Sequence, residues 1–169
     1  MIPVHGIQHI GLTVPNMDQA IRFFEEVFGA VTVLETGGLN VDDTYMARKL
    51  GVPGDRRIVN IKVLRCGRGS NLELFEYAGE DAGEPLKRNS QPGGFHIAFE
   101  VDDARQSADR LREIGVAVLE GPNHVDEGPL KGLTWVYLQA PWGQFLELVS
   151  MESLGYEVAT SERLWSPRD

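Results

Sequence analysis

Apolar and polar positions alternate in the same way in two stretches of the chain, residues 7–16 and 94–103. In each stretch a histidine, His9 or His96, stands next to the first of a series of apolar residues at every second position. This period of two is typical of a β-strand with one buried face, and it places both histidines on the opposite face. Because a capping residue and an amphipathic helix follow each strand with the same spacing, the pattern indicates an internal duplication.

The two halves are expected to contain the same elements in the same order. Asn16 and Asp103 are predicted to cap helices that end at Gly29 and Gly115. Strands are predicted at 7–14, 30–34, 58–64 and 71–77 in the first half, and at 95–101, 117–120, 133–139 and 144–150 in the second. Each half is therefore expected to be a βαβββ module.

Composition and charge narrow the class of partner. A chain of 169 residues that is 42% hydrophobic is long enough for one domain, or for two small modules with a common core. Its 16 basic and 25 acidic residues give a net charge of -9, which argues against nucleic acid or an anionic membrane and favours a small-molecule substrate. With no signal-peptide pattern and no long apolar run, the protein is predicted to be soluble and cytoplasmic. The single cysteine, Cys66, is interpreted as an ordinary strand-end residue.

The candidate chemistry lies in the last strand of each half, where the pattern Leu-Glu-Leu recurs around Glu73 and Glu147. If the leucines face the helices, both glutamates point to the same side as His9 and His96. Two imidazoles and two carboxylates form a ligand set suited to Zn, Ni, Co, Mn or Fe. Any one of these residues is also an ordinary strand residue, and copying alone would preserve them, but their recurrence at matching positions favours a metal site.

The predicted fold is therefore α+β, with two tandem βαβββ modules forming a curved mixed sheet that has a concave metal-binding cleft and helices on its convex face. An insertion at about 36–57 is expected to contain a short helix capped by Asp42 or Asp43. The predicted parts are a first module at 1–77, a linker at 78–93, a second module at 94–150 and a C-terminal tail at 151–169.

The paired modules, with His-Ile near their starts and Leu-Glu-Leu at their ends, resemble the vicinal oxygen chelate superfamily of glyoxalases, bleomycin resistance proteins and extradiol dioxygenases. The resemblance covers about residues 6–150 and is greatest to bacterial glyoxalase I or methylmalonyl-CoA epimerase-type members. It implies that His9, Glu73, His96 and Glu147 bind one divalent metal ion. Extradiol dioxygenases use the counterparts of His9, His96 and Glu147 on Fe(II), so Glu73 favours the other branch. The long insertion and the Ala-Pro-Trp-Gly turn at 140–143 depart from the family pattern and argue against glutathione specificity.

By this resemblance we expect a divalent-metal-dependent lyase or isomerase of the glyoxalase or epimerase type. Its substrate would be a small carbonyl or hydroxy-carbonyl compound, converted by proton abstraction through a metal-stabilised enediolate. Glu147 is the first choice of catalytic base, with Glu73 as the complementary acid or base. The alternatives are an Fe(II) extradiol-type dioxygenase and a metal-free drug-sequestering binding protein. The resemblance also implies a homodimer.

Four further groups of residues have assigned positions in this interpretation. His5 and His124 are expected at the surface. In the insertion, Tyr45, Arg48 and Lys49 form either a lid or substrate wall, or an ordinary solvated helix. The cleft is expected to be lined by Thr13, Phe75, Ala98 and Phe145. The residues expected beneath the helices are Ile10, Leu12, Ile97 and Phe99.

Overall fold

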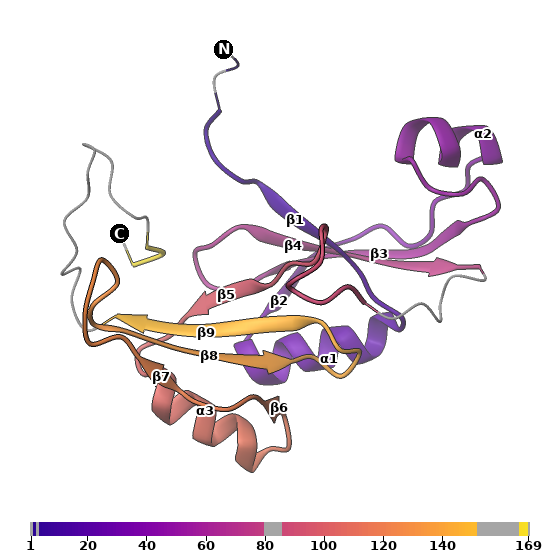
Figure 1. Cartoon of the computed structure of the whole chain (residues 1–169). Helices are drawn as coiled ribbons and strands as arrows, with labels where there is room; N and C mark the ends of the chain where they lie inside the picture. Colours follow the sequence, from indigo (N-terminus) through magenta and orange to yellow (C-terminus); the bar gives the residue numbers. More distant parts are fainter. Residues whose placement is uncertain (1, 3, 80–85, 152–165, 169) are drawn as a thin grey trace. The chain divides into compact units, whose positions relative to one another are not determined.

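The computed structural model describes residues 2, 4–79, 86–151 and 166–168 (Figure 1). The chain divides into two compact units, Met1–Glu84 and Pro85–Asp169. Each unit has its own mixed sheet and a βαβββ order of elements, which confirms the predicted α+β class.

The first unit has a sheet of four strands. Its elements are β1 (His9–Thr13), α1 (Met17–Phe28), β2 (Val31–Glu35), α2 (Asp43–Tyr45), η1 (Met46–Leu50), β3 (Arg57–Arg65) and β4 (Asn71–Ala78). The strand order is β1-β4-β3-β2, and β1 runs parallel to β4 while the other pairs are antiparallel. The strand with His9 therefore lies directly beside the strand with Glu73.

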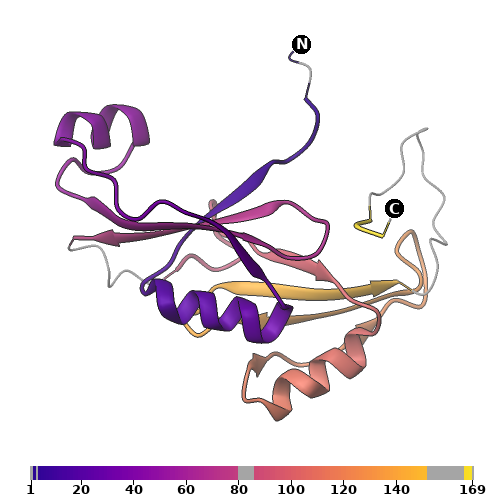
Figure 2. The ribbon, with the colours of Figure 1, turned by 180° about the vertical axis from the view of Figure 1, so that it is seen from behind.

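The second unit repeats this arrangement. Its elements are β5 (Ile97–Glu100), α3 (Ala104–Glu113), β6 (Ala117–Val118), β7 (Asn123–His124), β8 (Leu133–Gln139) and β9 (Phe145–Met151). The strand order is β5-β9-β8-β6, and β7 pairs with β8 in addition. As in the first unit, the first and last strands along the chain, β5 and β9, are parallel neighbours. In Figures 1 and 2, β6 lies at the side of α3, which it contacts. Three strands are shorter than predicted: β1 spans only His9–Thr13, His96 directly precedes β5, and β6 ends at Val118.

The predicted helix caps are present. The Asn16 side chain accepts a hydrogen bond from the Gln19 backbone N–H at 2.8 Å, and Gly29 ends α1 in a left-handed conformation, with φ of 61°. Asp103 accepts bonds from two N–H groups at the start of α3. In the insertion the cap is Asp42, which accepts from the Tyr45 N–H at 2.8 Å. These caps fix where each helix begins relative to the strand before it.

The insertion forms a helical segment in which α2 continues into η1, beyond the sheet of the first unit in both views (Figures 1 and 2). Met46 is fully buried, whereas Arg48 and Lys49 are exposed. The structure therefore agrees with the interpretation of these two cations as solvated side chains.

Alternation along the central strands separates a core face from a functional face in each unit. Leu72 and Leu74 on β4, and Leu146 and Leu148 on β9, are buried, whereas the glutamates between them are not. Helix α1 contacts β4, and α3 contacts β6, β8 and β9. Burial of these leucines stabilises the strand register, and because side chains alternate along a strand, the intervening side chains lie on the other face.

The edge strands are less buried than the sequence predicts. Leu12 and Ile97 are buried as expected, but Ile10 and Phe99 are half-buried. The reason is the strand order, which places β1 and β5 at sheet edges, where a side chain has neighbouring strands on one side only.

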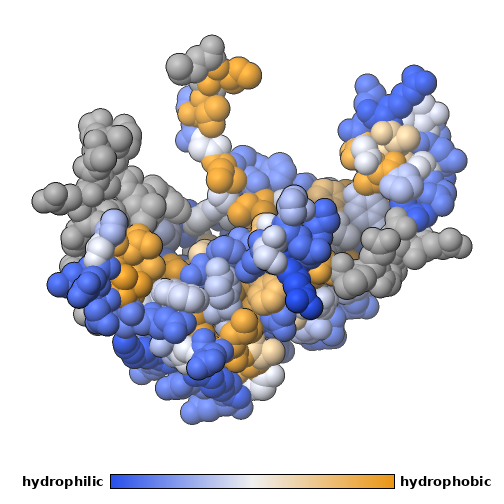
Figure 3. Space-filling model, viewed as in Figure 1, coloured by the Kyte–Doolittle hydropathy of each residue, from blue (hydrophilic) through white to orange (hydrophobic). Residues whose placement is uncertain are grey.

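Two features lie at the ends of the described chain. Exposed apolar side chains lie along the segment before β1, namely Ile2, Val4 and Ile7. Orange, hydrophobic surface is visible on the protruding N-terminal segment in Figure 3. At the other end, Arg168 forms ion pairs with Glu100 at 3.0 Å and Asp102 at 2.7 Å. Among the described residues there is no helix with the length and apolar character that a bilayer crossing requires.

Candidate active site

The first histidine and glutamate meet on the functional face of the first unit. In the parallel pair β1 and β4, His9 is opposite Asn71 and Gly11 is opposite Glu73. His9 and Glu73 are thus two positions apart on neighbouring strands and share one face. Their Nε2 and Oε2 atoms are 3.3 Å apart, and the side chains are 48% and 27% exposed.

The second pair repeats this geometry in the second unit. In β5 and β9, Ile97 is opposite Leu146 and Ala98 is opposite Glu147. In the register of the two parallel strands, His96 therefore lies two positions before the residue opposite Glu147, as His9 lies two positions before the residue opposite Glu73. The His96 Nε2 and Glu147 Oε2 atoms are 3.1 Å apart, and the two side chains are 36% and 14% exposed. The duplication found in the sequence is thus also a duplication of side-chain geometry.

Each pair fits the spacing of two neighbouring ligands on one metal ion. Ligand atoms bound at about 2.0 to 2.2 Å and separated by about 90° to 110° lie roughly 2.8 to 3.6 Å from each other. Both separations, 3.3 Å and 3.1 Å, fall in this range, which a hydrogen bond from histidine to carboxylate also satisfies. In the part of the chain that the structure describes, no group of three or more candidate ligands occurs, so each unit brings together two of the four predicted residues.

Hydrogen bonds fix the backbone that carries each histidine. In the second unit, the buried Gln144 donates from Nε2 to the carbonyl oxygens of Phe95 at 3.1 Å and Phe145 at 3.2 Å. The segment before His96 is therefore tied to the strand that carries Glu147.

The first unit has an equivalent connection. The Ser70 hydroxyl, at the position that matches Gln144, donates to the Ile7 carbonyl at 2.8 Å, and the Asn71 amide donates to the Gln8 carbonyl at 2.9 Å. His9 Nδ1 also hydrogen-bonds to the Gln8 side-chain oxygen, which directs Nε2 toward Glu73.

Tyr137 is a site residue that the sequence reasoning missed. It lies opposite Glu147 on β8, and its ring centroid is 5.0 Å from that of His96 at an interplanar angle of 87°. The matching position in the first unit, opposite Glu73, is Val63. The two pairs therefore differ at this position of the neighbouring strand. In the first unit the phenol near the glutamate is instead Tyr77 on β4, whose pKa is raised by burial and further by the charge of Glu73. The pairing of Tyr137 with Glu147 follows from counting residues back from the turn between β8 and β9, so the sequence contains the information that would have predicted it.

The partial burial of the second pair changes its proton affinities. Desolvation raises the pKa of the Glu147 carboxyl, and the charge and hydrogen bond of His96 partly oppose this rise. Desolvation also raises the pKa of the Tyr137 hydroxyl, with a further contribution from the charge of Glu147. Tyr137 therefore keeps its proton and remains a hydrogen-bond donor at neutral pH.

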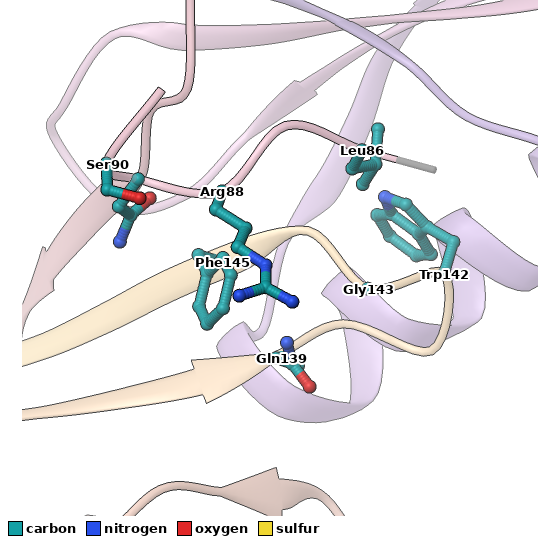
Figure 4. A pocket seen from close by; sticks show the side chains of 8 residues that line it. Leu86, Arg88, Ser90, Gln139, Trp142, Gly143 and Phe145 are labelled. Carbon is teal, nitrogen blue, oxygen red and sulfur yellow. The ribbon is translucent and has the colours of Figure 1, made fainter. Parts of the chain in front are cut away.

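A pocket of about 740 Å³ opens on the functional face of the second unit (Figure 4). Its floor includes Gln139 and Phe145, which lie opposite each other two positions from Tyr137 and Glu147. The segment before β5 contributes Arg88 to the wall.

The remaining predicted residues have the following positions. Thr13 and Ala98 are exposed, and Phe75 and Phe145 are half-buried, all on the strand faces of the glutamates. His5 is exposed. His124, also exposed, lies in the short strand β7 and not in a loop, with Nδ1 at 2.9 Å from the Thr134 hydroxyl.

Comparison with known families identifies the class of protein to which this fold and site belong. The model of the glyoxalase/bleomycin resistance protein/dioxygenase superfamily matches residues 6–148, and the chain belongs to this superfamily. Members commonly bind a divalent metal ion.

Two relatives are named as epimerases. The chain is 42% identical over 167 residues to a 2-epi-5-epi-valiolone epimerase from Actinomyces sp., spanning 96% of this chain and 88% of the relative. It is 26% identical over 118 residues to an ethylmalonyl-CoA/methylmalonyl-CoA epimerase from Cereibacter sphaeroides, spanning 67% of this chain and 73% of that protein. These relatives support an enzyme of the isomerase type that acts on a small molecule.

Solved structures support the fold. A glyoxalase family protein from Bacillus cereus superposes with a TM-score of 0.63 at 19% identity, covering 89% of this chain and 96% of that chain. A genomically encoded fosfomycin resistance protein from Listeria monocytogenes gives a TM-score of 0.59 at 16% identity, covering 88% and 94%.

Proposed function

We propose that the protein is a divalent-metal-dependent epimerase that inverts the stereocentre next to the ketone of a polyhydroxylated carbocycle such as 2-epi-5-epi-valiolone. The observation that carries the proposal is the repeated histidine–glutamate pair, at the same strand offset in both units and with separations of 3.3 Å and 3.1 Å. The choice of substrate rests on the 42% identity to the Actinomyces epimerase along 96% of this chain.

Both named relatives act on compounds in which a carbon next to a carbonyl group carries an acidic hydrogen. Removing that proton from one face and returning one to the other face inverts the centre. The reaction needs a group that stabilises the negative charge on the carbonyl oxygen and at least one group that moves the proton. The proposed ligands are His9, Glu73, His96 and Glu147, and the ion they hold supplies a Lewis acid for that charge.

Within this proposal, the carboxylates move the proton. Glu147 accepts it from the carbon next to the ketone, and Glu73, which occupies the matching position of the other module, is the complementary acid or base. Tyr137 lies opposite Glu147 in the register and is placed to donate a hydrogen bond on this face. The exclusion of water is strongest around Glu147, whose side chain is 14% exposed.

The position of Glu73 supports the epimerase over a dioxygenase. A facial triad on Fe(II) has no use for a second glutamate, yet Glu73 turns toward His9 with its Oε2 atom 3.3 Å from Nε2. A binding protein that sequesters a drug without metal has no use for either pair. We include in the proposal the homodimer that the resemblance implies.

The direct test is proton exchange in heavy water. The protein, loaded with one divalent metal, is incubated with 2-epi-5-epi-valiolone, and proton NMR follows the hydrogen next to the ketone and the appearance of the epimer. Glu147→Gln should retain the metal and lose about 10²-fold or more of the exchange rate, because an amide cannot accept the proton.

The matched control is Glu113→Gln, at an exposed helix position. It should leave the rate unchanged. If wild-type protein loaded with metal exchanges no proton of the cyclitol, the proposed substrate is wrong. If Glu147→Gln exchanges at the wild-type rate, the assigned base is wrong.

A further inference from the structure

The pocket of the second unit continues the face that carries Glu147. Phe145 precedes Glu147 by two positions on β9, and Gln139 follows Tyr137 by two positions on β8, so all four side chains share one face. The volume of about 740 Å³ lies within the range of small-molecule sites. A molecule bound at Glu147 therefore has room to extend into this pocket.

The lining combines an apolar part with a polar part. The apolar part consists of Leu86, Trp142 and Phe145. The polar part consists of the neutral side chains Asn89, Ser90 and Gln139 and the cation Arg88, and no acidic residue lines the pocket among the residues that the structure describes. Aromatic surface next to neutral hydrogen-bonding groups suits a ring that has apolar faces and hydroxyl groups around its rim.

Arg88 presents its guanidinium donors to this pocket. In Figure 4 its side chain extends toward the strand ends that carry Phe145 and Gln139. Its backbone N–H donates to the Gln91 side-chain oxygen at 2.8 Å, and among the described residues no carboxylate pairs with its guanidinium. A guanidinium has five N–H donors in a fixed plane, so it is available to an oxygen acceptor of a ligand.

Hydrogen bonds tie the turn that carries Arg88 to the segment that leads into His96. The Gln91 N–H donates to the Arg88 carbonyl at 2.9 Å, and the Gly94 N–H donates to the Gln91 carbonyl at 2.7 Å. A Cβ atom on Gly94 would lie 1.9 Å from the Arg88 carbonyl oxygen, so only glycine allows this approach. Because Gly94 is two residues from His96, the turn fixes the Arg88 backbone relative to the catalytic pair.

We propose that Arg88 and Trp142 form the subsite that determines substrate specificity. The Trp142 indole covers an apolar face of a polyhydroxylated ring, and the Arg88 guanidinium donates to one of the ring's oxygen substituents. This inference rests on the proposed function, because it assigns the part of the substrate away from the reacting carbon. A single cation among neutral polar groups fits a hydroxylated ring better than a phosphate, for which several charged donors are usual.

The test is calorimetric titration of the metal-loaded protein with 2-epi-5-epi-valiolone, together with steady-state kinetics. Arg88→Met should weaken binding about tenfold to a hundredfold, the range for losing hydrogen bonds from a charged group. KM should rise by the same factor while kcat changes little. Arg88→Lys, which keeps the charge without the planar fork, should recover only part of the affinity. Arg105→Met, at an exposed position of α3, is the control and should bind as wild type does.

A second variant leaves the Arg88 side chain unsubstituted and changes the backbone that positions it. Gly94→Ala should displace the turn and also weaken binding, and circular dichroism with thermal melting identifies any variant that fails to fold. Inorganic phosphate is titrated separately, and binding that depends on Arg88 but is displaced by phosphate would make this an anion site and overturn the assignment.

The outcomes separate the subsite from the reaction. If wild-type protein turns over the cyclitol and Arg88→Met binds it as tightly as wild type does, the subsite is overturned and the proposed function stays intact. Cyclitol binding that depends on Arg88, without proton exchange, supports the subsite and overturns the reaction. Absence of any cyclitol binding by wild-type protein overturns the subsite.

Discussion

Gln144 offers a test of how the site is held in place. Its side chain is 8% exposed and donates to the carbonyls of Phe95 and Phe145. Gln144→Leu keeps a similar volume but removes both hydrogen bonds, each worth about 0.5 to 1.5 kcal/mol. The free energy of unfolding should fall by about 1 to 3 kcal/mol. The backbone before His96 should also lose its tie to β9, so metal affinity should fall by about 10- to 100-fold, as for other residues that orient a ligand.

Urea unfolding followed by circular dichroism measures the first effect, and competition with a fluorescent chelator measures the second. Gln106→Leu, an exposed position on α3, is the matched control and should change neither quantity appreciably. Metal binding by Gln144→Leu as tight as that of wild type would contradict this role of Gln144, because His96 would then be oriented without it. A loss of affinity equal to that of the control would have the same meaning.

Three further predictions concern the core, the cysteine and the C-terminal end. Leu148→Ala should cost about 2 to 5 kcal/mol in urea unfolding, whereas the half-buried Phe99→Ala should cost only about 1 to 3 kcal/mol, and equal costs would contradict the edge-strand argument. Burial raises the pKa of the Cys66 thiol from 9.0 to about 11, partly opposed by Arg65, so at pH 8 iodoacetamide should modify the folded protein roughly a hundredfold more slowly than the unfolded chain. The pKa of this thiol is higher in the folded protein than in the unfolded chain, so the stability that the thiol contributes is present below pH 9 and is lost as the pH rises through about 11. A contribution to the free energy of unfolding that rises over this interval would contradict the prediction. Arg168→Ala removes the ion pairs to Glu100 and Asp102, so carboxypeptidase should shorten the chain faster than it shortens an Arg105→Ala control, as mass spectrometry would detect.

Local patterns were sufficient to predict the element order and the faces of the strands. Alternation around Glu73 and Glu147 fixed which side chains are buried, and the caps Asn16 and Asp103 marked where the helices begin. These features depend on spacing along one strand or one helix turn, which the sequence displays directly.

Features that depend on which strands are neighbours were not predicted. The reduced burial of Phe99 follows from the edge position of β5, which no local pattern indicates. Tyr137 is beside Glu147 because of the hairpin register, and the two-residue strand that contains His124 is too short to have a detectable period. Arg88 lies in a segment without periodicity, where the glycine at 94 was the available signal of a close backbone approach.

In the proposed function, His9, Glu73, His96 and Glu147 hold one metal ion together. Metal analysis of protein purified without added metal, followed by titration with Zn, Ni, Co or Mn, tests it directly. We expect about one equivalent per chain, strongly reduced in His9→Ala and in His96→Ala alike, because each unit contributes only two of the four proposed ligands. Two equivalents, or one that persists when either histidine is removed, would mean that the pairs do not act as one site, and no binding at any concentration tested would contradict the metal-dependent mechanism.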